Sequence, residues 1–299
     1  MSAALTAPPP SPRSAGALSV PLRLPARRYG HRRRLETLSV ASIRAFEKCP
    51  EAFRRHHLLG EREPMTLSLV MGSVVGDAIS HFFQARIEGG ALDAGEVDDL
   101  VVELFDAKIE KAVLAPEEDA AAARAQCRAG AADYLEELAP GLEVISVERR
   151  AGFRFEEAQE WRFVCYFDLE CPLELCDLKF GLSGVKEVRV ARDLQATAQT
   201  FMRWAEGRPA IFSFHSGVRE RPEEGPRWHA VPAPRTHAQL LGFRERVARV
   251  ARQIVHLDRT EPGPWPLSSD LGWWCAPPAG GDGCAFWARC PVGAGKGLA

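Results

Sequence analysis

Two aspartates and one lysine near the middle of the chain are residues that can build a hydrolytic metal site. Asp177 and Lys179 stand in LELCDLKF, and Asp168 stands nine positions earlier in EWRFVCYFDLE. Both segments have the apolar and aromatic content of strands, so Asp177 and Lys179 are expected on one strand face. Carboxylate oxygens suit Mg²⁺ or Mn²⁺. A neighbouring lysine would stabilise the negative charge that develops when metal-bound water attacks a phosphate.

A second Asp-x-Lys triplet shows how weak this pattern is when taken alone. Asp106 and Lys108 occur in a stretch with helical apolar spacing, where such a pair is expected on a solvated helix face. Only the triplet at Asp177 combines a predicted strand with an upstream aspartate. The surroundings of that triplet therefore decide its interpretation.

The eight cysteines form two groups. Three lie near the C-terminus in GWWCAPPAGGDGCAFWARCP, and a tetrahedral or cluster site needs a fourth thiolate. Cys49, in FEKCPEAFRRHH, is the candidate for that fourth ligand. By softness, thiolates bind Zn²⁺ or an iron-sulfur cluster equally well, and free structural cysteines are the third interpretation. Small core residues are expected at the other four positions, Cys127, Cys165, Cys171 and Cys176.

The predicted elements change from helices to a sheet along the chain. Residues 39–57 are expected to be helical, with a break or kink at Pro50. Further helices are expected over 71–87, 96–113, 116–138, 193–205 and 236–258, and strands over 142–155, 160–170, 173–180, 210–215 and 228–231. This order predicts a mixed α/β domain with a helical insertion between the first helix and the sheet.

Composition bounds the class of protein. The chain has 299 residues, 46% of them hydrophobic, and a formal net charge of −2. It can bury a large core, and it is not a protein that binds nucleic acid through bulk positive charge. No stretch has the run of about 20 apolar residues that a membrane span needs. The cysteine content and the lack of a secretory signal predict a cytoplasmic location.

The chain is expected to form one folded domain with two flexible ends. Residues 1–37 are basic and rich in proline, which predicts a disordered tail. Residues 292–299 are expected to be flexible. The single domain would cover 38–291, divided into a helical part (38–140), a core (141–260) and a cysteine-rich region (261–291).

The order of these motifs resembles the RecB-like branch of the PD-(D/E)XK nuclease superfamily, which includes AddB-type helicase-nucleases and CRISPR-adaptation nucleases. The resemblance implies a restriction-endonuclease-like core, which is a mixed sheet flanked by helices, with an N-terminal helical insertion and a C-terminal cysteine staple. The residues that carry it are His81 in GSVVGDAISHFF, Glu148 in VISVERRAGFRF, Asp168, Asp177 with Lys179, and Gln195 in RDLQATAQTF.

The resemblance also implies a role for each of these residues. Asp168 and Asp177 would bind Mg²⁺ or Mn²⁺, and His81 would be a further metal ligand or a phosphate contact. Lys179 would position or activate water, and Gln195 would orient Lys179 or the DNA backbone. Glu148 would support the metal indirectly. The sequence departs from the family pattern at three positions, where Cys165 replaces glycine, Phe180 replaces threonine and Gln199 replaces tyrosine.

For the cysteines, the resemblance favours a 4Fe-4S cluster over Zn²⁺. Its ligands would be Cys49, Cys275, Cys284 and Cys290. Arg54 and Arg55, which follow the first of these cysteines, are expected to contact DNA phosphates.

The implied function is a metal-dependent DNA nuclease that hydrolyses phosphodiester bonds. It would be of exonuclease type and act in DNA repair, recombination, or phage- or CRISPR-related processing, with any helicase or recombination partner on a separate chain. The alternative is a catalytically weak or inactive protein of the same fold that binds DNA or assembles complexes around an iron-sulfur or zinc centre. A zinc-bound structural protein unrelated to nucleases is a third interpretation.

Overall fold

The computed structural model describes residues 37–290 except 62, 64, 156–157, 210, 261–263, 268–274 and 276–283. The expected basic tail, apart from Thr37, and the expected flexible end therefore lie outside the described residues. Most of the region 261–291 also lies outside them.

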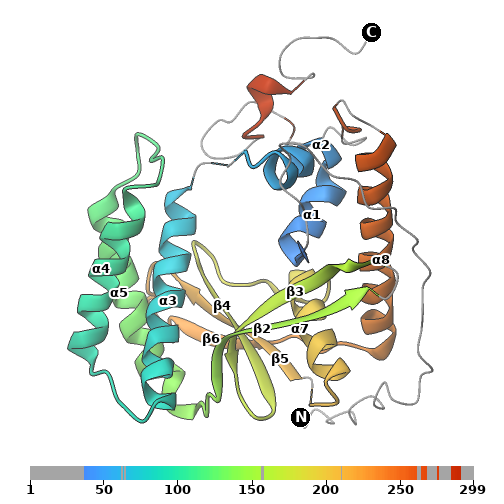
Figure 1. Ribbon diagram of the computed structural model, residues 1–299. Coiled ribbons are helices and arrows are strands. Elements are labelled where there is room, and N and C mark those ends of the chain that lie inside the picture. Colours follow the sequence, from blue (N-terminus) through green and yellow to red (C-terminus); the bar gives the residue numbers. More distant parts are fainter. Residues whose placement is uncertain are drawn as a thin grey trace.

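A mixed β-sheet forms the centre of the fold (Figure 1). The strand order is β1-β3-β4-β5-β6, and β2 pairs with β3. The β2–β3, β3–β4 and β5–β6 pairs are antiparallel, whereas β1–β3 and β4–β5 are parallel. The strands are β1 (Thr37–Leu38), β2 (Ser146–Phe155), β3 (Ala158–Glu170), β4 (Glu174–Gly181), β5 (Ile211–Val218) and β6 (Trp228–Pro232).

Helices cover both faces of this sheet, as Figure 1 shows. One apolar cluster joins α3, α4 and α5 to the sheet, and a second joins α1, α7 and α8 to it. The prediction of a mixed sheet flanked by helices is confirmed. The helices are α1 (Val40–Lys48), α2 (Pro50–Phe53), α3 (Leu67–Ile87), α4 (Ala94–Ile109), α5 (Ala120–Glu137), α6 (Glu187–Val190), α7 (Leu194–Ala205) and α8 (His237–Thr260), with a π-helical turn over Arg54–Leu58 and 3₁₀ turns over Ala139–Gly141 and Trp287–Arg289.

Local sequence explains where the first helical stretch is divided. Ser39 and Ser42 form a capping box that starts α1. Cys49 has an extended backbone, and Pro50 begins α2 at a position where its missing N–H costs nothing. The predicted break at Pro50 is thus where the structure separates α1 from α2. Strand β1 was not predicted, because two residues are too short for a pattern.

The second Asp-x-Lys triplet lies on α4. Asp106 is exposed and forms an ion pair with Arg124 of α5 at 3.2 Å, as expected for a solvated helix face. Lys108 is half-buried and pairs instead with Asp77 of α3. This triplet therefore fastens helices to each other and takes no part in the sheet.

Candidate active site

Three carboxylates occupy one row across β2, β3 and β4. In the β2–β3 register, Glu148 stands opposite Asp168. The β3–β4 register pairs Leu169 with Cys176, so Asp168 and Asp177 are the next residues along these two strands, and the Asp168 Oδ2 accepts a hydrogen bond from the Leu178 N–H. Residues that stand opposite each other on neighbouring strands are close in space. The sheet thus gathers the three acidic residues that the sequence singled out.

The pKa values of these carboxyl groups show that they affect one another. Burial, and then the charge of Asp177, raises the pKa of Asp168 to about 8. Burial, followed by the charge of Asp77 on α3, raises the pKa of Glu148. Burial also raises the pKa of Asp177, although Lys179 opposes this. Neighbouring carboxylates of this kind are hard-oxygen donors whose repulsion a divalent cation would relieve.

Asp177 is fully buried and is contacted by three side chains. Its Oδ2 forms an ion pair with Lys179 Nζ. Its Oδ1 accepts hydrogen bonds from Gln195 Nε2 and, at 3.4 Å, from Gln199 Nε2. Lys179 Nζ also donates to Gln195 Oε1 at 3.4 Å. Gln195 therefore bridges the carboxylate and the lysine, and its role of orienting Lys179 or the DNA backbone stays a prediction.

Helix α7 positions both glutamines. Asp193 caps the helix by accepting hydrogen bonds from the backbone N–H groups of Gln195 and Ala196 at 2.8 and 3.0 Å. Gln199 lies one turn further along and also donates to the Tyr166 carbonyl at 2.9 Å. Its contact with Asp177 was not foreseen, although the i, i+4 spacing from Gln195 places the two glutamines on one helix face.

The strand backbone is irregular at Glu148 on β2 and at Asp168 on β3. Glu148 has a φ of 47°, which is in the left-handed region and is strained for a residue with a side chain. On β3, Phe167 packs in the cluster beside α7, whereas Leu169 packs in the cluster beside α3. The regular alternation of side chains is therefore interrupted at Asp168, which turns that carboxylate toward β4. Its Oδ2 accepts a hydrogen bond from the Leu178 N–H at 2.9 Å.

The carboxylate oxygens at this site are the ligand type that a hard divalent cation prefers, but they are not grouped closely enough to hold one in this structure. Among the described residues, no three His, Cys, Asp or Glu side chains are grouped closely enough to hold a metal ion. His81 is exposed on α3, directly after Ser80, whose hydroxyl interacts electrostatically with Glu148. Its role as a ligand or phosphate contact stays a prediction.

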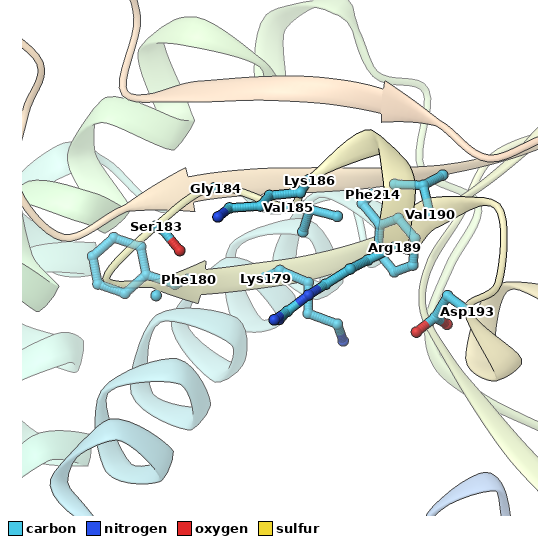
Figure 2. A pocket seen from close by; sticks show the side chains of 11 residues that line it. Lys179, Phe180, Ser183, Gly184, Val185, Lys186, Arg189, Val190, Asp193 and Phe214 are labelled. Carbon is cyan, nitrogen blue, oxygen red and sulfur yellow. The ribbon is translucent and has the colours of Figure 1, made fainter.

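A cleft of about 350 Å³ opens beside Lys179 (Figure 2). The connection from β4 to α7, including α6, forms much of its wall. Lys186 and Arg189 line it together with Lys179, and Asp193 is the acidic residue in its described lining. Sequence reasoning did not select Lys186 or Arg189, because nothing in the pattern shows that this connection folds back over the lysine.

Arg54 and Arg55 have intramolecular partners, and the expectation that they contact DNA phosphates stays a prediction. Arg54 is buried, and its Nε and Nη2 donate to the two Glu51 carboxylate oxygens at 2.7 and 2.9 Å. Arg55 donates to Glu51 at 2.8 Å and to the Arg289 carbonyl at 2.9 Å. The i, i+3 and i, i+4 spacing from Glu51 is a sequence signal for these pairs. Arg55 thereby links this segment to the 3₁₀ turn over Trp287–Arg289.

The four cysteines expected to form one centre are near enough for their charges to interact, but among the described residues no three of them are grouped closely enough to hold a metal ion. Cys49 precedes α2, and Cys290 follows the 3₁₀ turn that Arg55 holds. After burial, the charges of the other three thiols raise the pKa of Cys284, and those of Cys290 and Cys49 raise the pKa of Cys275. The other group, Cys127, Cys165, Cys171 and Cys176, is buried as expected of small core residues.

Comparison with known proteins agrees with this geometry. The sequence profile of the PD-(D/E)XK nuclease superfamily matches residues 37–291. The fold is similar to a crystal structure of a candidate exonuclease from Eubacterium rectale, with a TM-score of 0.51 and 15% sequence identity over 77% of this chain and 84% of that chain. No curated protein matches the chain. Within the described residues, no helix has the length and apolar character needed to cross a membrane.

Proposed function

Because the chain belongs to the PD-(D/E)XK nuclease superfamily, we propose that it is a metal-dependent DNA nuclease of the RecB-like branch. It hydrolyses phosphodiester bonds as an exonuclease and acts in DNA repair, recombination, or phage- or CRISPR-related processing, beside a separate helicase or recombination partner. The observation that carries the nuclease proposal is the row of Glu148, Asp168 and Asp177, with Lys179 in contact with Asp177.

Each residue has a distinct task in this proposal. Asp168 and Asp177 would hold Mg²⁺ or Mn²⁺, and Glu148 would add negative charge behind them. When bound, the metal lowers the pKa of its water and neutralises charge on the phosphate. Lys179 places an ammonium group beside the attacked phosphate, where it stabilises the charge that develops. Gln195 holds that ammonium group in position through the 3.4 Å contact with its Oε1.

A cleavage assay tests this proposal. Purified protein is incubated with end-labelled single- and double-stranded DNA in Mg²⁺, in Mn²⁺ and in EDTA. We expect cleavage in the two metals and none in EDTA, and the release of mononucleotides or short fragments from DNA ends. Lys179→Ala should reduce the rate by about 10²-fold or more, the usual effect of removing one charge-stabilising donor.

The same assay shows whether the cleavage comes from this site and whether it starts from DNA ends. Cleavage that is equally fast in Lys179→Ala comes from a contaminant or from another site, and it would overturn the assignment. Release of large internal fragments from a circular substrate would contradict the exonuclease part alone.

One observation favours a second candidate, a weak or inactive protein that binds DNA or assembles complexes. In the described structure, Lys179, Gln195 and Gln199 all contact the Asp177 carboxylate. Metal binding at Asp177 requires some of these contacts to be exchanged. Tight DNA binding without cleavage in either metal would support this candidate over the nuclease.

We further propose that Cys49, Cys275, Cys284 and Cys290 bind a 4Fe-4S cluster, with Zn²⁺ as the alternative. Burial is the main cause that raises the pKa of Cys275 and Cys284, and the further contribution from neighbouring thiols supports a shared centre. A thiol pKa raised by neighbouring thiols means that their thiolates repel one another, and a metal centre removes that repulsion. Such a centre would tie the first helices to the end of the chain.

Cys284→Ala tests the centre. We expect the variant to lose bound metal and to unfold at a lower temperature, because a cross-link over so long a loop restricts the unfolded chain. Anaerobically purified parent should show a broad visible absorbance band if the centre is iron-sulfur, and none if it is zinc. Cys165→Ala is the matched control, because Cys165 lies in the sheet core. Equal metal content in parent and Cys284→Ala would contradict the centre.

A further inference from the structure

We propose that the cleft beside Lys179 binds a second phosphate of the DNA strand through Lys186 and Arg189, next to the phosphate that is cleaved. This inference rests on the proposed function, because it takes Lys179 as the group beside the reacting phosphate. In this proposal, the β4–α6 connection and α6 align the DNA strand on the row of Glu148, Asp168 and Asp177.

The connection that carries these cations is fastened at Gly181 and at Val185, just before Lys186. The Arg219 N–H donates to the Gly181 carbonyl at 2.9 Å, and the Val185 N–H donates to Ser216 Oγ at 2.7 Å. Ser216 itself pairs with Lys179 in the β4–β5 register. The loop is therefore fastened to the strand beside Lys179. Cations on such a support lose little freedom when they bind a phosphate, which favours binding.

Position 184 shows how closely this loop lies on β5. A Cβ atom built at Gly184 would come within 3.3 Å of Ser216 Oγ and 3.4 Å of His229 Cε1. The loop thus approaches β5 and β6 as closely as a glycine allows. A tightly seated loop keeps the following residues, which include Lys186 and Arg189, at one wall of the cleft.

The charges of these two residues are available to a ligand. Elsewhere in the protein arginines are paired with carboxylates, as Arg128 is with Asp98 and Arg246 with Glu47, both at 2.5 Å. Within the described part of the chain, no ion pair involves Lys186 or Arg189, and both are exposed. Figure 2 shows Arg189 extending from α6 over β4, in the same cleft as Lys179.

The acidic residue of the cleft does not cancel this positive charge. Asp193 pairs with Arg44 at 2.7 Å and caps α7 through the N–H groups of Gln195 and Ala196. Burial opposes its ionisation, but these backbone hydrogen bonds and Arg44 hold the pKa of Asp193 below its usual value. The remaining ionisable side chains of the cleft, Lys179, Lys186 and Arg189, are cationic, which suits a phosphodiester backbone.

The expected ligand is therefore one phosphate of a flexible DNA strand. A contact with phosphate alone carries no base sequence, so the subsite should act equally on all sequences. It should also add to the salt dependence of binding, because each neutralised phosphate releases counterions.

The experiment compares parent protein, Lys186→Ala/Arg189→Ala and the control Lys111→Ala/Arg128→Ala. The control removes two exposed cations that lie away from the cleft, Lys111 in the turn after α4 and Arg128 on α5. Binding of a fluorescent oligo-dT of twelve nucleotides is measured in EDTA over a range of salt concentrations. Cleavage of the same probe is measured in Mg²⁺. For the cleft variant we expect about tenfold weaker binding, and the slope of log K against log salt concentration should fall by about 0.7, the value for one phosphate of single-stranded DNA. KM should rise by a similar factor, while kcat changes less than KM.

Uncharged methylphosphonate linkages show which phosphate of the strand Lys186 and Arg189 contact. A set of oligo-dT probes each carries one methylphosphonate, moved one linkage at a time from the labelled end. Parent protein should lose affinity at one linkage beside the cleavage point, and the cleft variant should be insensitive there. Lys186→Gln/Arg189→Gln, with a thermal melt beside it, replaces the alanine pair if that pair fails to fold.

Failures of the two proposals give different results. If parent cleaves, and the cleft variant equals it in salt slope, KM and methylphosphonate response, the subsite is wrong and the nuclease stands. If parent does not cleave in either metal, the nuclease proposal is wrong. A reduced salt slope of the cleft variant in EDTA would still support phosphate binding at Lys186 and Arg189.

Discussion

Replacing Asp177 with asparagine should abolish cleavage and, at the same time, make the metal-free protein more stable. Asp177 is fully buried beside Asp168, and burial raises the pKa of both carboxyl groups. Asparagine keeps the shape and removes one of these charges. A metal-site ligand supplies several kcal/mol of transition-state stabilisation, so we expect a rate loss of about 10³-fold or more.

The gain in stability should depend on pH in a defined direction. The folded-state pKa of Asp168 is about 8, against 3.8 for an unperturbed aspartate. The folded state therefore holds this proton more tightly than the unfolded state. Its contribution is complete below about pH 4 and is lost as pH rises through 8. In Asp177→Asn the charge of Asp177 no longer opposes ionisation of Asp168, so the loss of stability with rising pH should be smaller.

Thermal melts in EDTA between pH 4 and pH 9 measure this effect. Near neutral pH we expect the melting temperature of Asp177→Asn to exceed that of the parent by about 2–6 °C, the size of 1–2 kcal/mol in a chain of this length. Adding Mg²⁺ should narrow the difference by stabilising the parent alone. Retained cleavage, or a variant that is less stable than the parent at every pH, would contradict this assignment.

Replacing Glu170 with glutamine should cost about 3–5 kcal/mol of folding free energy. Glu170 is buried and accepts hydrogen bonds from Arg149, Arg203 and Arg208. Burial raises its pKa, but Arg149 and the other partners hold the pKa of Glu170 below its usual value. Glutamine would leave the fully buried Arg203 without an opposing charge.

Urea unfolding at pH 7 tests this expectation, and Glu47→Gln is the control. Glu47 pairs with Arg246 at the surface, where loss of a pair changes stability by about 1 kcal/mol or less. Removing Arg208 together with Glu170 should recover part of the loss, because fewer like charges then face each other. If Glu170→Gln lowers the free energy of unfolding only as much as Glu47→Gln does, the three arginines do not need the charge of Glu170 to remain buried.

The strand period was sufficient to predict much of the site. Residues two apart on a strand share a face, so Asp177 and Lys179 could be placed together before any coordinates were known. The row with Asp168 followed from the antiparallel connection, and the sheet with helices on both faces followed from the order of elements. These features depend on local patterns and short connections, which a single sequence carries.

What could not be predicted depends on packing between distant segments. The contact of Gln199 with Asp177 requires the exact placement of α7 on β4. The seating of the loop that carries Lys186 requires a hydrogen bond from Val185 to β5. The ion pair between Arg54 and Glu51 was likewise not foreseen, because it depends on how α2 and the turn after it pack.

The pairing of β1 with β3 has a consequence for the order in which the chain folds. Thr37 pairs with Arg162, about 125 residues further along, so β1 and α1 cannot reach their final places until β3 has left the ribosome. Helices α3, α4 and α5 pack mainly against one another over short sequence distances, and they can form first. We therefore expect β1 and α1 to dock last during synthesis, after α3, α4 and α5 have formed a surface on which β3 and β4 can pack.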